Sequence, residues 1–410
     1  MDKLKIAEYV RMAPKKMTQR ANFVTVGMKP PKKIVATVGC SGDIGKEVKA
    51  LTNGKNILII SDKILDQLGT VGMISDFLKE EGFNVKTFCE VEAEPHIETA
   101  EKIYEIGRIY NVSVIVGIGG GSVMDMSKLA AQSFGNKVEP RMFGDRKMEP
   151  NNSAVPLILL PTTSGTGSEV SVYFVVAYGE EKRFFLNQSL LPDIAMIDPV
   201  LTVSMPPWVT ATTGIDELTH AAEAVMNKKS SAMSDIIGLG AIELIAKNLR
   251  KAVYNGEDIE ARYNMAVGSA MAMIAFNMCG GLWAHSVSYI LPFVKGLPHG
   301  LGCSLALPFL IDYNLQVIPD QIAKMAKSMQ GAGSTDSTIQ AAKKAVHLTA
   351  ELITDIGLPL TIKEFGVESN MLEELALKMM KMYPRPLNPR TMNQKEAVAF
   401  WEAMYNGTLR

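Results

Sequence analysis

Val114-Ile115-Val116-Gly117-Ile118-Gly119-Gly120-Gly121-Ser122 is the stretch that decides the fold of this chain. An apolar run leads into glycines, and a helical pattern from Ser122 to about Gln132 follows them. This order predicts a buried strand over 112–116, a tight turn and the start of a helix. Glycines at such a turn let a ligand approach the backbone, and free N–H groups at a helix start favour a phosphate.

The stretch is not the dinucleotide-binding fingerprint, because the sixth position counted from Gly117 is Ser122 rather than glycine. A second glycine-rich loop, residues 161–169, follows another expected strand at 156–160. Either loop alone could be a plain tight turn. Two such loops after successive strands favour a nucleotide cleft, because ligands of parallel sheets bind at the carboxyl ends of the strands.

Outward from this stretch, the first half of the chain alternates strands with helices. Strands are expected at 56–61 and 84–89, and helices at 65–80 and 97–110. The alternation predicts an α/β domain with a mostly parallel sheet over residues 1–206.

From Pro206 onward the sequence pattern becomes helical, and Pro207 suits the first turn of a helix. We expect a second, all-helical domain over residues 207–410. Its helices are expected at 207–226, 233–250, 259–278, 337–355 and 370–383.

Composition narrows the class of protein. The 410 residues carry a formal charge of −1, which gives no reason to expect nucleic acid or an anionic membrane as a partner. The four cysteines are scattered without a Cys-x-x-Cys pair, so we expect a reducing, cytoplasmic setting. The segment from Met1 to Ile6 does not resemble the start of a secretion signal, and no run approaches the ~20 apolar residues that span a membrane.

One aspartate and three of the five histidines have the spacing of a divalent-metal site. Asp216 and His220 are four residues apart in a helical pattern, so they project from one helix face, and His285 and His299 follow. This donor set suits Fe²⁺, Zn²⁺ or another late divalent ion better than Mg²⁺ or Ca²⁺. An aspartate and a histidine four residues apart are weak evidence on their own. They could also be a pair of surface residues, or the histidine could be hydrogen-bonded in the core.

Asp62 ends the strand expected at 56–61. Its carboxylate could accept hydrogen bonds from both ribose hydroxyls of an adenosine and would repel a 2′-phosphate. It could also cap the following helix, and the two roles are compatible.

Together these motifs resemble the iron-containing (group III) alcohol dehydrogenases, from about Lys32 to the C-terminus. The markers are, in order, Ser61-Asp62-Lys63, Gly119-Gly120-Gly121-Ser122 with Asp125, residues 161–169, Leu191-Pro192-Asp193 with Asp198-Pro199, Gly214-Ile215-Asp216 with His220, Pro298-His299-Gly300 and Asn388-Pro389-Arg390.

The resemblance implies a dehydroquinate-synthase-like fold, in which a cofactor and a metal meet in a cleft between two domains. It implies NAD(H) and Fe²⁺, with Zn²⁺ or Mn²⁺ as alternatives, a small primary alcohol and its aldehyde as substrates, and a homodimer or larger homo-oligomer.

The resemblance also assigns site residues by position. The metal ligands would be Asp216, His220, His285 and His299. The cofactor contacts would be Asp62, Gly119, Gly120, Gly121, Ser122, Asp125, Thr162, Thr163, Thr166 and Lys182, and the substrate pocket would include Thr166, Tyr173, Val175 and Phe276. Lys182 is also a catalytic candidate.

Two positions depart from the family pattern. Tyr289 stands where many members have a second histidine that is thought to relay the alcohol proton, and we take Tyr289 as the catalytic candidate there. A phenol with an ordinary pKa near ~10 is a poorer shuttle at neutral pH. His96 stands in Pro95-His96-Ile97, where the family usually has Pro-Asn-Pro. It either faces the cleft, favouring an anionic substrate, or is an exposed loop residue.

Three other functions remain open from the sequence. One is a zinc-dependent polyol dehydrogenase, and another is a dehydroquinate-synthase-like lyase on the same fold. The apolar residues around Phe276, Cys279 and Trp283 disfavour the lyase, which should bind its substrate with several lysines and arginines. The third is a non-catalytic binding protein, which should have lost metal ligands.

Overall fold

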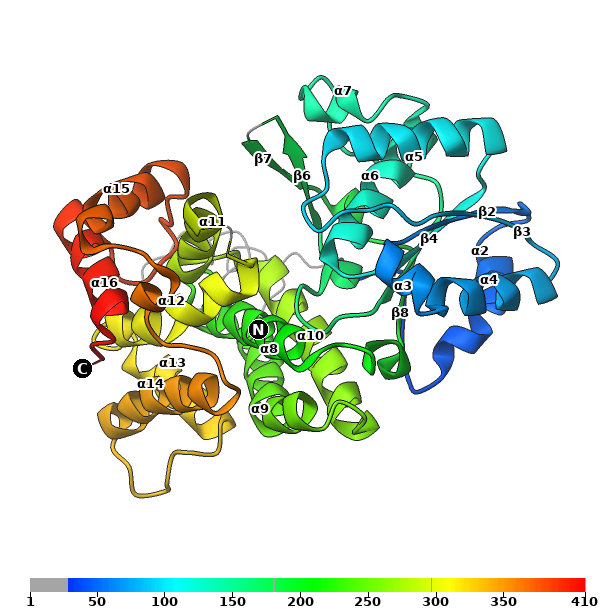
Figure 1. Cartoon of the computed structure of the whole chain (residues 1–410). Coiled ribbons are helices and arrows are strands. Elements are labelled where there is room, and N and C mark those ends of the chain that lie inside the picture. Colours follow the sequence, from blue (N-terminus) through cyan, green and yellow to red (C-terminus); the bar gives the residue numbers. More distant parts are fainter. Residues whose placement is uncertain (1–28, 180, 296, 410) are drawn as a thin grey trace, which may run out of the picture.

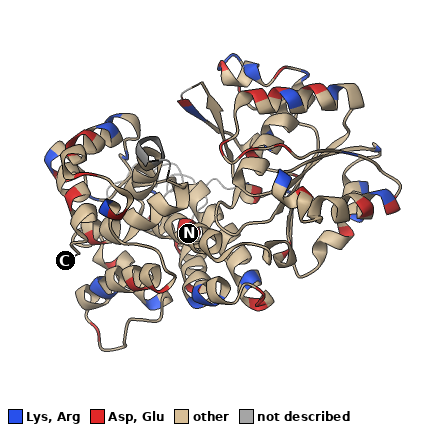
Figure 2. Cartoon of the chain, viewed as in Figure 1, with Lys and Arg blue, Asp and Glu red and all other residues tan. Residues whose placement is uncertain are grey.

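The computed structural model describes residues 29–179, 181–295 and 297–409, so the expectation for Met1 to Ile6 lies outside the described residues. In Figure 1 a sheet with helices on both faces forms one part of the molecule, and the helices from α8 onward form the other. In Figure 2 segments coloured for basic and for acidic residues both occur along outer helices such as α4 and α5, so neither sign dominates there.

Six parallel strands form the sheet in the order β1-β8-β5-β4-β2-β3. The strands are β1 (Lys33–Ala36), β2 (Asn56–Ile60), β3 (Asn84–Phe88), β4 (Val114–Gly119), β5 (Leu157–Pro161) and β8 (Ile194–Ile197). The central strands β4, β5 and β8 are buried along their whole length, as a sheet covered on both faces requires. The predicted α/β fold with a mostly parallel sheet is confirmed.

Helices cover the two faces of the sheet with separate cores. Ile57 and Ile59 of β2 belong to the core formed with α2 (Ile44–Leu51) and α4 (Thr70–Glu80). Leu58 and Ile60 belong to the opposite core, under α5 (Ile97–Tyr110) and α6 (Gly121–Asn136). This alternation follows from the two-residue period of a strand.

The structure corrects two of the expected elements. The helix expected over 65–80 is two helices, α3 (Lys63–Gln67) and α4, because Gly69 adopts a left-handed φ of 81° between them. The strand expected over 112–116 runs over Val114–Gly119 instead. A Cβ on Gly117 would lie 2.5 Å from Ser127 Oγ and 2.7 Å from Leu159 Cδ2, so the missing side chain lets α6 pack directly on the strand.

A separate antiparallel hairpin, not expected from the sequence, is formed by β6 (Tyr173–Tyr178) and β7 (Glu181–Leu186). In Figure 1 it stands beside α11 (Trp283–Lys295), and the rings of Phe184 and Tyr289 are 5.1 Å apart. The remaining short elements are α7 (Arg141–Gly144) and the 3-10 turns Cys40–Asp43, Ser168–Val170, Gln188–Leu190, Pro199–Thr202, Ile362–Phe365 and Ser369–Met371.

The second part of the molecule is helical around one large core. Besides α11 its helices are α8 (Pro207–Met226), α9 (Ala232–Tyr254), α10 (Ile259–Cys279), α12 (His299–Asn314), α13 (Pro319–Ser328), α14 (Thr338–Asp355), α15 (Leu372–Met382) and α16 (Gln394–Asn406). The five helices expected from the sequence correspond to α8, α9, α10, α14 and α15. No strand follows β8 in the part of the chain that the structure describes.

Within the described ranges, no single helix combines the length and apolar character needed to cross a membrane. In the same described ranges, α10 and the first part of α11 meet both criteria as a pair, and the two are bent by 107°.

Candidate active site

Helix α8 carries the first two predicted metal ligands inside the protein. Asp216 is 3% exposed and His220 5%, and both lie on the same face of the helix because they are four residues apart. Burial lowers the pKa of His220 to about 4, so its imidazole is neutral at pH 7 and has a lone pair to offer.

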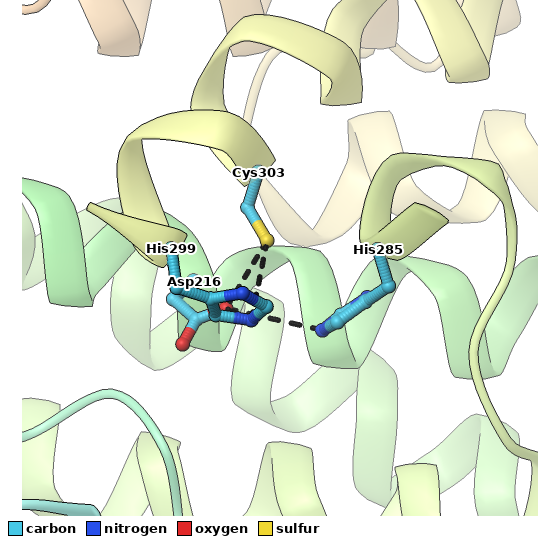
Figure 3. Close-up of side chains that lie close together, drawn as sticks. All are labelled: Asp216, His285, His299 and Cys303. Atoms are coloured by element: carbon cyan, nitrogen blue, oxygen red, sulfur yellow. Dashed lines mark hydrogen bonds and ion pairs between the residues drawn. The ribbon is translucent and has the colours of Figure 1, made fainter. Parts of the chain in front are cut away.

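Helices α11 and α12 bring the other two predicted ligands to Asp216 (Figure 3). His285 Nε2 is 3.9 Å from Asp216 Oδ1, and His299 Nε2 is 3.6 Å from the same oxygen. A fourth side chain completes this cluster: Cys303 Sγ lies 3.3 Å from Asp216 Oδ1 and 3.9 Å from His299 Nε2. The donor atoms of these four residues all lie within 4.8 Å of one another.

His220 stands beside this cluster, its ring centroid 4.7 Å from that of His285. Two ring nitrogens in the site, His220 Nδ1 and His285 Nε2, are buried without a hydrogen-bond partner. A buried polar atom without a partner is costly unless something binds it. Neutral imidazoles, a carboxylate and a thiol are donors that late divalent ions accept, so these residues fit a metal ion.

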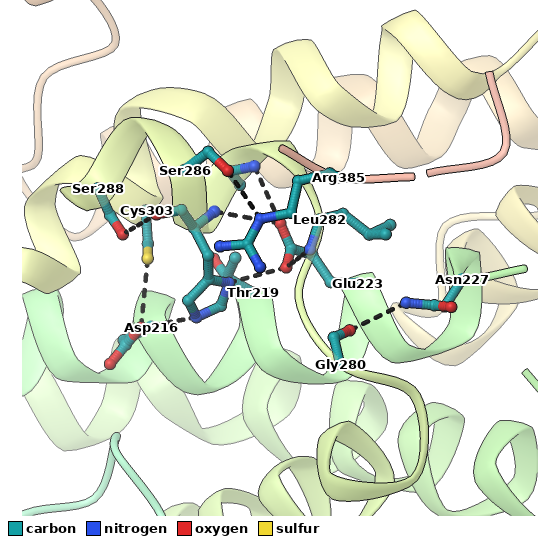
Figure 4. Close-up of polar contacts among 12 residues, drawn as sticks. Asp216, Thr219, Glu223, Asn227, Gly280, Leu282, Ser286, Ser288, Cys303 and Arg385 are labelled. Atoms are coloured by element: carbon teal, nitrogen blue, oxygen red, sulfur yellow. Dashed lines mark hydrogen bonds and ion pairs between the residues drawn. The ribbon is translucent and has the colours of Figure 1, made fainter. Parts of the chain in front are cut away.

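Glu223, one turn beyond His220, lies within a network of polar contacts (Figure 4), and it holds the predicted ligand His285 in place. Its buried carboxylate accepts from His285 Nδ1 at 2.8 Å and from the backbone N–H groups of Ala284 and His285 at 2.9 and 3.2 Å. A carboxylate only accepts, so Nδ1 carries the proton and the lone pair lies on Nε2, toward Asp216. Glu223 was not predicted from the sequence, although its position seven residues after Asp216 puts it on the same helix face.

Two glycines of α12 allow the close packing of the three helices. A Cβ on Gly300 would overlap the carbonyl oxygen of Thr212 in α8, and a Cβ on Gly302 would lie 2.6 Å from Ser288 Cα in α11. His299 and Cys303, at either end of this glycine-containing turn, therefore reach the Asp216 carboxylate.

The glycine-rich loop after β4 leads into α6 on the other side of the cleft. The N-cap residue of α6, Gly120, provides no side-chain cap, so the first N–H groups of the helix remain open to a ligand. A Cβ on Gly121 would lie 2.8 Å from Thr166 Cγ2, so the two glycine-rich loops touch. Thr162 N–H donates to Gly119 O at 3.1 Å, as expected for neighbouring strand ends.

Two charged side chains hold the second loop: Asp125, which was expected to contact the cofactor, and Lys128, which was not predicted from the sequence. Asp125 accepts from Ser168 Oγ at 2.7 Å and from the Val175 N–H at 2.9 Å. The buried Lys128 donates to Ser168 Oγ and to the carbonyl oxygens of Ser171 and Tyr173. Burial lowers the pKa of Lys128 to about 8.

One cleft of about 1050 Å³ joins the two halves of the site. Its lining includes Gly121, Ser122, Asp125, Thr166 and Lys182 from the α/β part, and Asp216, His220, His285 and His299 from the helical part. The predicted substrate residues Tyr173, Val175 and Phe276 also line it, as does Tyr289.

Other predicted residues lie at the same edge of the sheet without lining the cleft. Asp62 follows β2 and accepts from the Leu65 N–H, so it caps α3, and Thr163 lies against Gly120. His96 is exposed and begins α5, with its N–H donating to Glu92. The structure does not bring His96 to the cleft and places it as the exposed loop residue considered from the sequence.

Tyr289 and Lys182 lie near the cluster of donor side chains. The Tyr289 ring stacks on that of His299 at 5.2 Å, and burial raises its pKa above the ordinary value. Lys182 Nζ pairs with Glu94 at 2.8 Å. Arg385, not predicted from the sequence, lines the cleft and donates from Nε to Ser286 Oγ at 2.7 Å.

Comparisons with known proteins agree with this geometry. The model of the family described as iron-containing alcohol dehydrogenase matches residues 31–199, and that of the C-terminal part of the Fe-containing alcohol dehydrogenase family matches residues 210–405. Long-chain-alcohol dehydrogenase 1 of Geobacillus thermodenitrificans is 36% identical over 90% of this chain and 94% of its own length. Choline dehydrogenase of Bacillus subtilis is 33% identical over 92% and 94%.

The chain is also similar to solved structures of such enzymes. A crystal structure of 1,3-propanediol oxidoreductase superimposes with a TM-score of 0.88 at 30% identity, covering 93% of this chain and 100% of that one. An alcohol dehydrogenase from Oenococcus oeni has the same TM-score and coverage at 28% identity. The chain therefore belongs to the iron-containing alcohol dehydrogenase family and is an oxidoreductase, either an alcohol dehydrogenase or an aldehyde reductase.

Proposed function

We propose that this protein uses NAD(H) and a divalent metal to interconvert a small primary alcohol and its aldehyde. The observation that carries the proposal is the single cleft between a helix N-terminus built from glycines and a buried cluster of metal donors. The bound metal would supply a Lewis acid for the substrate oxygen, so that hydride can pass to or from the nicotinamide.

Each side of the cleft has its own part in this proposal. Asp216, His220, His285 and His299 would hold Fe²⁺, with Zn²⁺ or Mn²⁺ as alternatives. Gly119, Gly120, Gly121 and Ser122 would bind the pyrophosphate through backbone N–H groups, while Asp125, Thr162, Thr163, Thr166 and Lys182 would contact the rest of the cofactor.

Asp62 would select NAD(H) over NADP(H). It stands at the end of β2, next to the strand that leads into the glycine-rich turn, and its charge would repel a 2′-phosphate. We expect Asp62→Gly to raise kcat/KM with NADPH and lower it with NADH. Equal efficiency of the unaltered enzyme with the two cofactors would contradict this assignment.

The substrate would sit against aromatic side chains beside the donor cluster. Phe276 lies 4.7 Å from the His220 ring and 5.0 Å from the His285 ring, and Tyr173 lies 6.4 Å from Phe276. With Thr166 and Val175 these residues form the proposed substrate wall. These packed rings form an apolar surface beside the donor cluster, which supports a substrate with a hydrocarbon chain.

Tyr289 would pass the alcohol proton as a neutral phenol that donates and accepts in one step, because burial raises its pKa. Tyr289→Phe should lower kcat/KM by about 10²-fold without changing metal content. Tyr383→Phe is the matched control, because Tyr383 also lines the cleft and lies 5.0 Å from Tyr289. An unchanged rate in Tyr289→Phe would remove this residue from the mechanism.

The direct test is an anaerobic assay of the metal-reconstituted protein with NADH and a panel of neutral and acidic aldehydes. We expect turnover of small neutral aldehydes with Fe²⁺, Zn²⁺ or Mn²⁺. Turnover confined to polyols with zinc would favour a polyol dehydrogenase. No turnover with any metal and any aldehyde would contradict the proposal.

We further propose a division into two domains at Pro206–Pro207, where β8 and its following turn give way to α8. The four cysteines are unpaired, which supports a reducing, cytoplasmic location. A homodimer or larger assembly follows from the family resemblance, and sedimentation of the metal-loaded protein tests it.

A further inference from the structure

Cys303 is a buried thiol that the proposed mechanism does not use. It lies one helical turn after His299 on α12, and it is fully buried. Its sulfur contacts Asp216 and His299, two of the proposed ligands, and it belongs to the cluster of four donors in Figure 3.

The distances fit a shared ion. With metal–nitrogen and metal–oxygen bonds of about 2.0–2.2 Å and metal–sulfur bonds of about 2.3 Å, two donors of one ion lie roughly 3.0–4.5 Å apart, depending on the angle between their bonds. The sulfur is 3.3 Å from Asp216 Oδ1 and 3.9 Å from His299 Nε2. His299 and His285 are 3.6 and 3.9 Å from the same carboxylate oxygen. These separations fall within that range, so the atoms are close enough to share one ion.

A second observation points to a ligand at this place. His285 Nε2 is buried, has no hydrogen-bond partner, and is directed toward Asp216 by Glu223. Among the described residues, the cleft lining includes Asp216, His220, His285 and His299 but not Cys303. The sulfur would reach the ion from the protein side and leave the cleft side to the substrate.

We propose that Cys303 is a thiolate ligand of the catalytic metal, in addition to the one carboxylate and three imidazoles. This inference rests on the proposed metal site. When the ion binds, a metal–sulfur bond forms, the S–H bond breaks and the proton leaves to the buffer, with no change of oxidation state. A thiolate ligand favours zinc, iron and cobalt over manganese, so Cys303 would narrow the choice of metal.

Cobalt distinguishes a ligand from a neighbour. Metal-free protein is reconstituted anaerobically with one equivalent of Co²⁺, and its absorption spectrum is recorded. Thiolate ligation gives a near-ultraviolet sulfur-to-cobalt charge-transfer band, whereas visible bands report that cobalt is bound. We expect the charge-transfer band in the unaltered protein, and its loss in Cys303→Ser and Cys303→Ala. Cys279→Ser is the matched control, because Cys279 is a buried thiol outside the donor cluster.

Metal affinity provides a second readout. Chelator competition should show about 10- to 100-fold weaker Zn²⁺ binding in Cys303→Ser, with little change for Mn²⁺. Serine can still donate a hydrogen bond to Asp216. If Cys303→Ser binds zinc like the unaltered protein while Cys303→Ala does not, the thiol is only a hydrogen-bond donor and the inference is wrong.

The remaining outcomes are also decisive. Visible cobalt bands without a charge-transfer band would overturn the inference and leave the proposed dehydrogenase function intact. No cobalt binding at all would overturn both. Circular dichroism and thermal unfolding of each variant show whether it is folded, and the spectrum of the unaltered protein is informative without any variant.

Discussion

At the scale of single residues, the site depends on the state of a few buried ionisable groups. Glu223 fixes the tautomer of His285 by accepting from Nδ1. Glu223→Gln should let the imidazole ring rotate or let its proton move to Nε2, and should weaken Zn²⁺ binding by about 10- to 100-fold. Chelator competition measures this change.

Glu217→Gln is the matched control for that substitution. Glu217 is buried on the same helix, both of its carboxylate oxygens lack a hydrogen-bond partner, and burial raises its pKa well above the ordinary value. Burial therefore favours its uncharged form, which glutamine resembles. Equal loss of zinc affinity in both variants would show that any change on α8 disturbs the site.

The buried carboxyl group of Glu169 should make the stability of the protein depend on pH. Burial raises its pKa to about 7, from 4.5 in an unfolded chain. Between these values the folded state binds a proton that the unfolded state has lost, so the free energy of unfolding falls as pH rises. The free energy of unfolding should fall by roughly 3 kcal/mol between about pH 4.5 and pH 7, and this part of the stability should not return above pH 7.

Glu169→Gln should remove this part of the pH dependence. Urea unfolding at pH 5 should give similar stability for the two proteins, whereas at pH 8 the variant should be the more stable. The exposed Glu90→Gln serves as control and should leave the slope unchanged. If the free energy of unfolding of Glu169→Gln still fell with pH in the same way, another group would be the one that binds the proton on folding.

The sequence predicted residues at this scale unevenly. Asp216 and His220 could be found because a spacing of four on a helix is a local pattern. Cys303 has the same spacing from His299, yet in an apolar helix a cysteine is typical of a core. Its role depends on α8 lying opposite, a contact between residues 87 apart that no local pattern contains.

At the scale of elements, α12 must approach α8 closely. Gly300→Ala would place a Cβ on the Thr212 carbonyl, so α12 should move away and carry His299 and Cys303 with it. We expect a loss of about 1–3 kcal/mol in stability, together with weaker metal binding. Unfolding and chelator competition measure the two effects.

Gly72→Ala provides the contrasting case. Gly72 lies in α4, nothing lies within 4 Å of its added Cβ, and the change should stabilise the protein by about 0.5–1 kcal/mol. Metal affinity should not change. If Gly300→Ala behaves like Gly72→Ala, the close approach of the helices is not required.

The elements themselves were predicted where one local period dominates. The strand over Asn56–Ile60 and the helix over Ile97–Tyr110 were found almost residue for residue. The β6–β7 hairpin was not, because it lies outside the parallel sheet and packs its aromatic residues against α11. Gly69 ended α3 through its left-handed φ, which a helical pattern of apolar residues does not show.

At the scale of the whole molecule, cofactor and metal bind to different parts that meet at one cleft. The glycine-rich turn belongs to the sheet, and the donor cluster belongs to the helices. Each part has its own hydrophobic core, and a smaller core formed by Val170, Ala195 and Ile197 with residues of α10 joins the two parts.

Because the first glycine-rich turn and the donor cluster belong to different parts, we expect the two binding events to be largely independent. Removal of the metal should abolish turnover but leave NADH binding within a small factor, as measured by NADH fluorescence. Gly121→Val should do the reverse. Even a Cβ at this position lies 2.8 Å from Thr166 Cγ2, so the larger side chain should close the turn to the pyrophosphate while Co²⁺ still binds with an unchanged visible spectrum. If metal removal abolished NADH binding, the donor cluster would also be shaping the cofactor site, and the separation into two halves would be wrong.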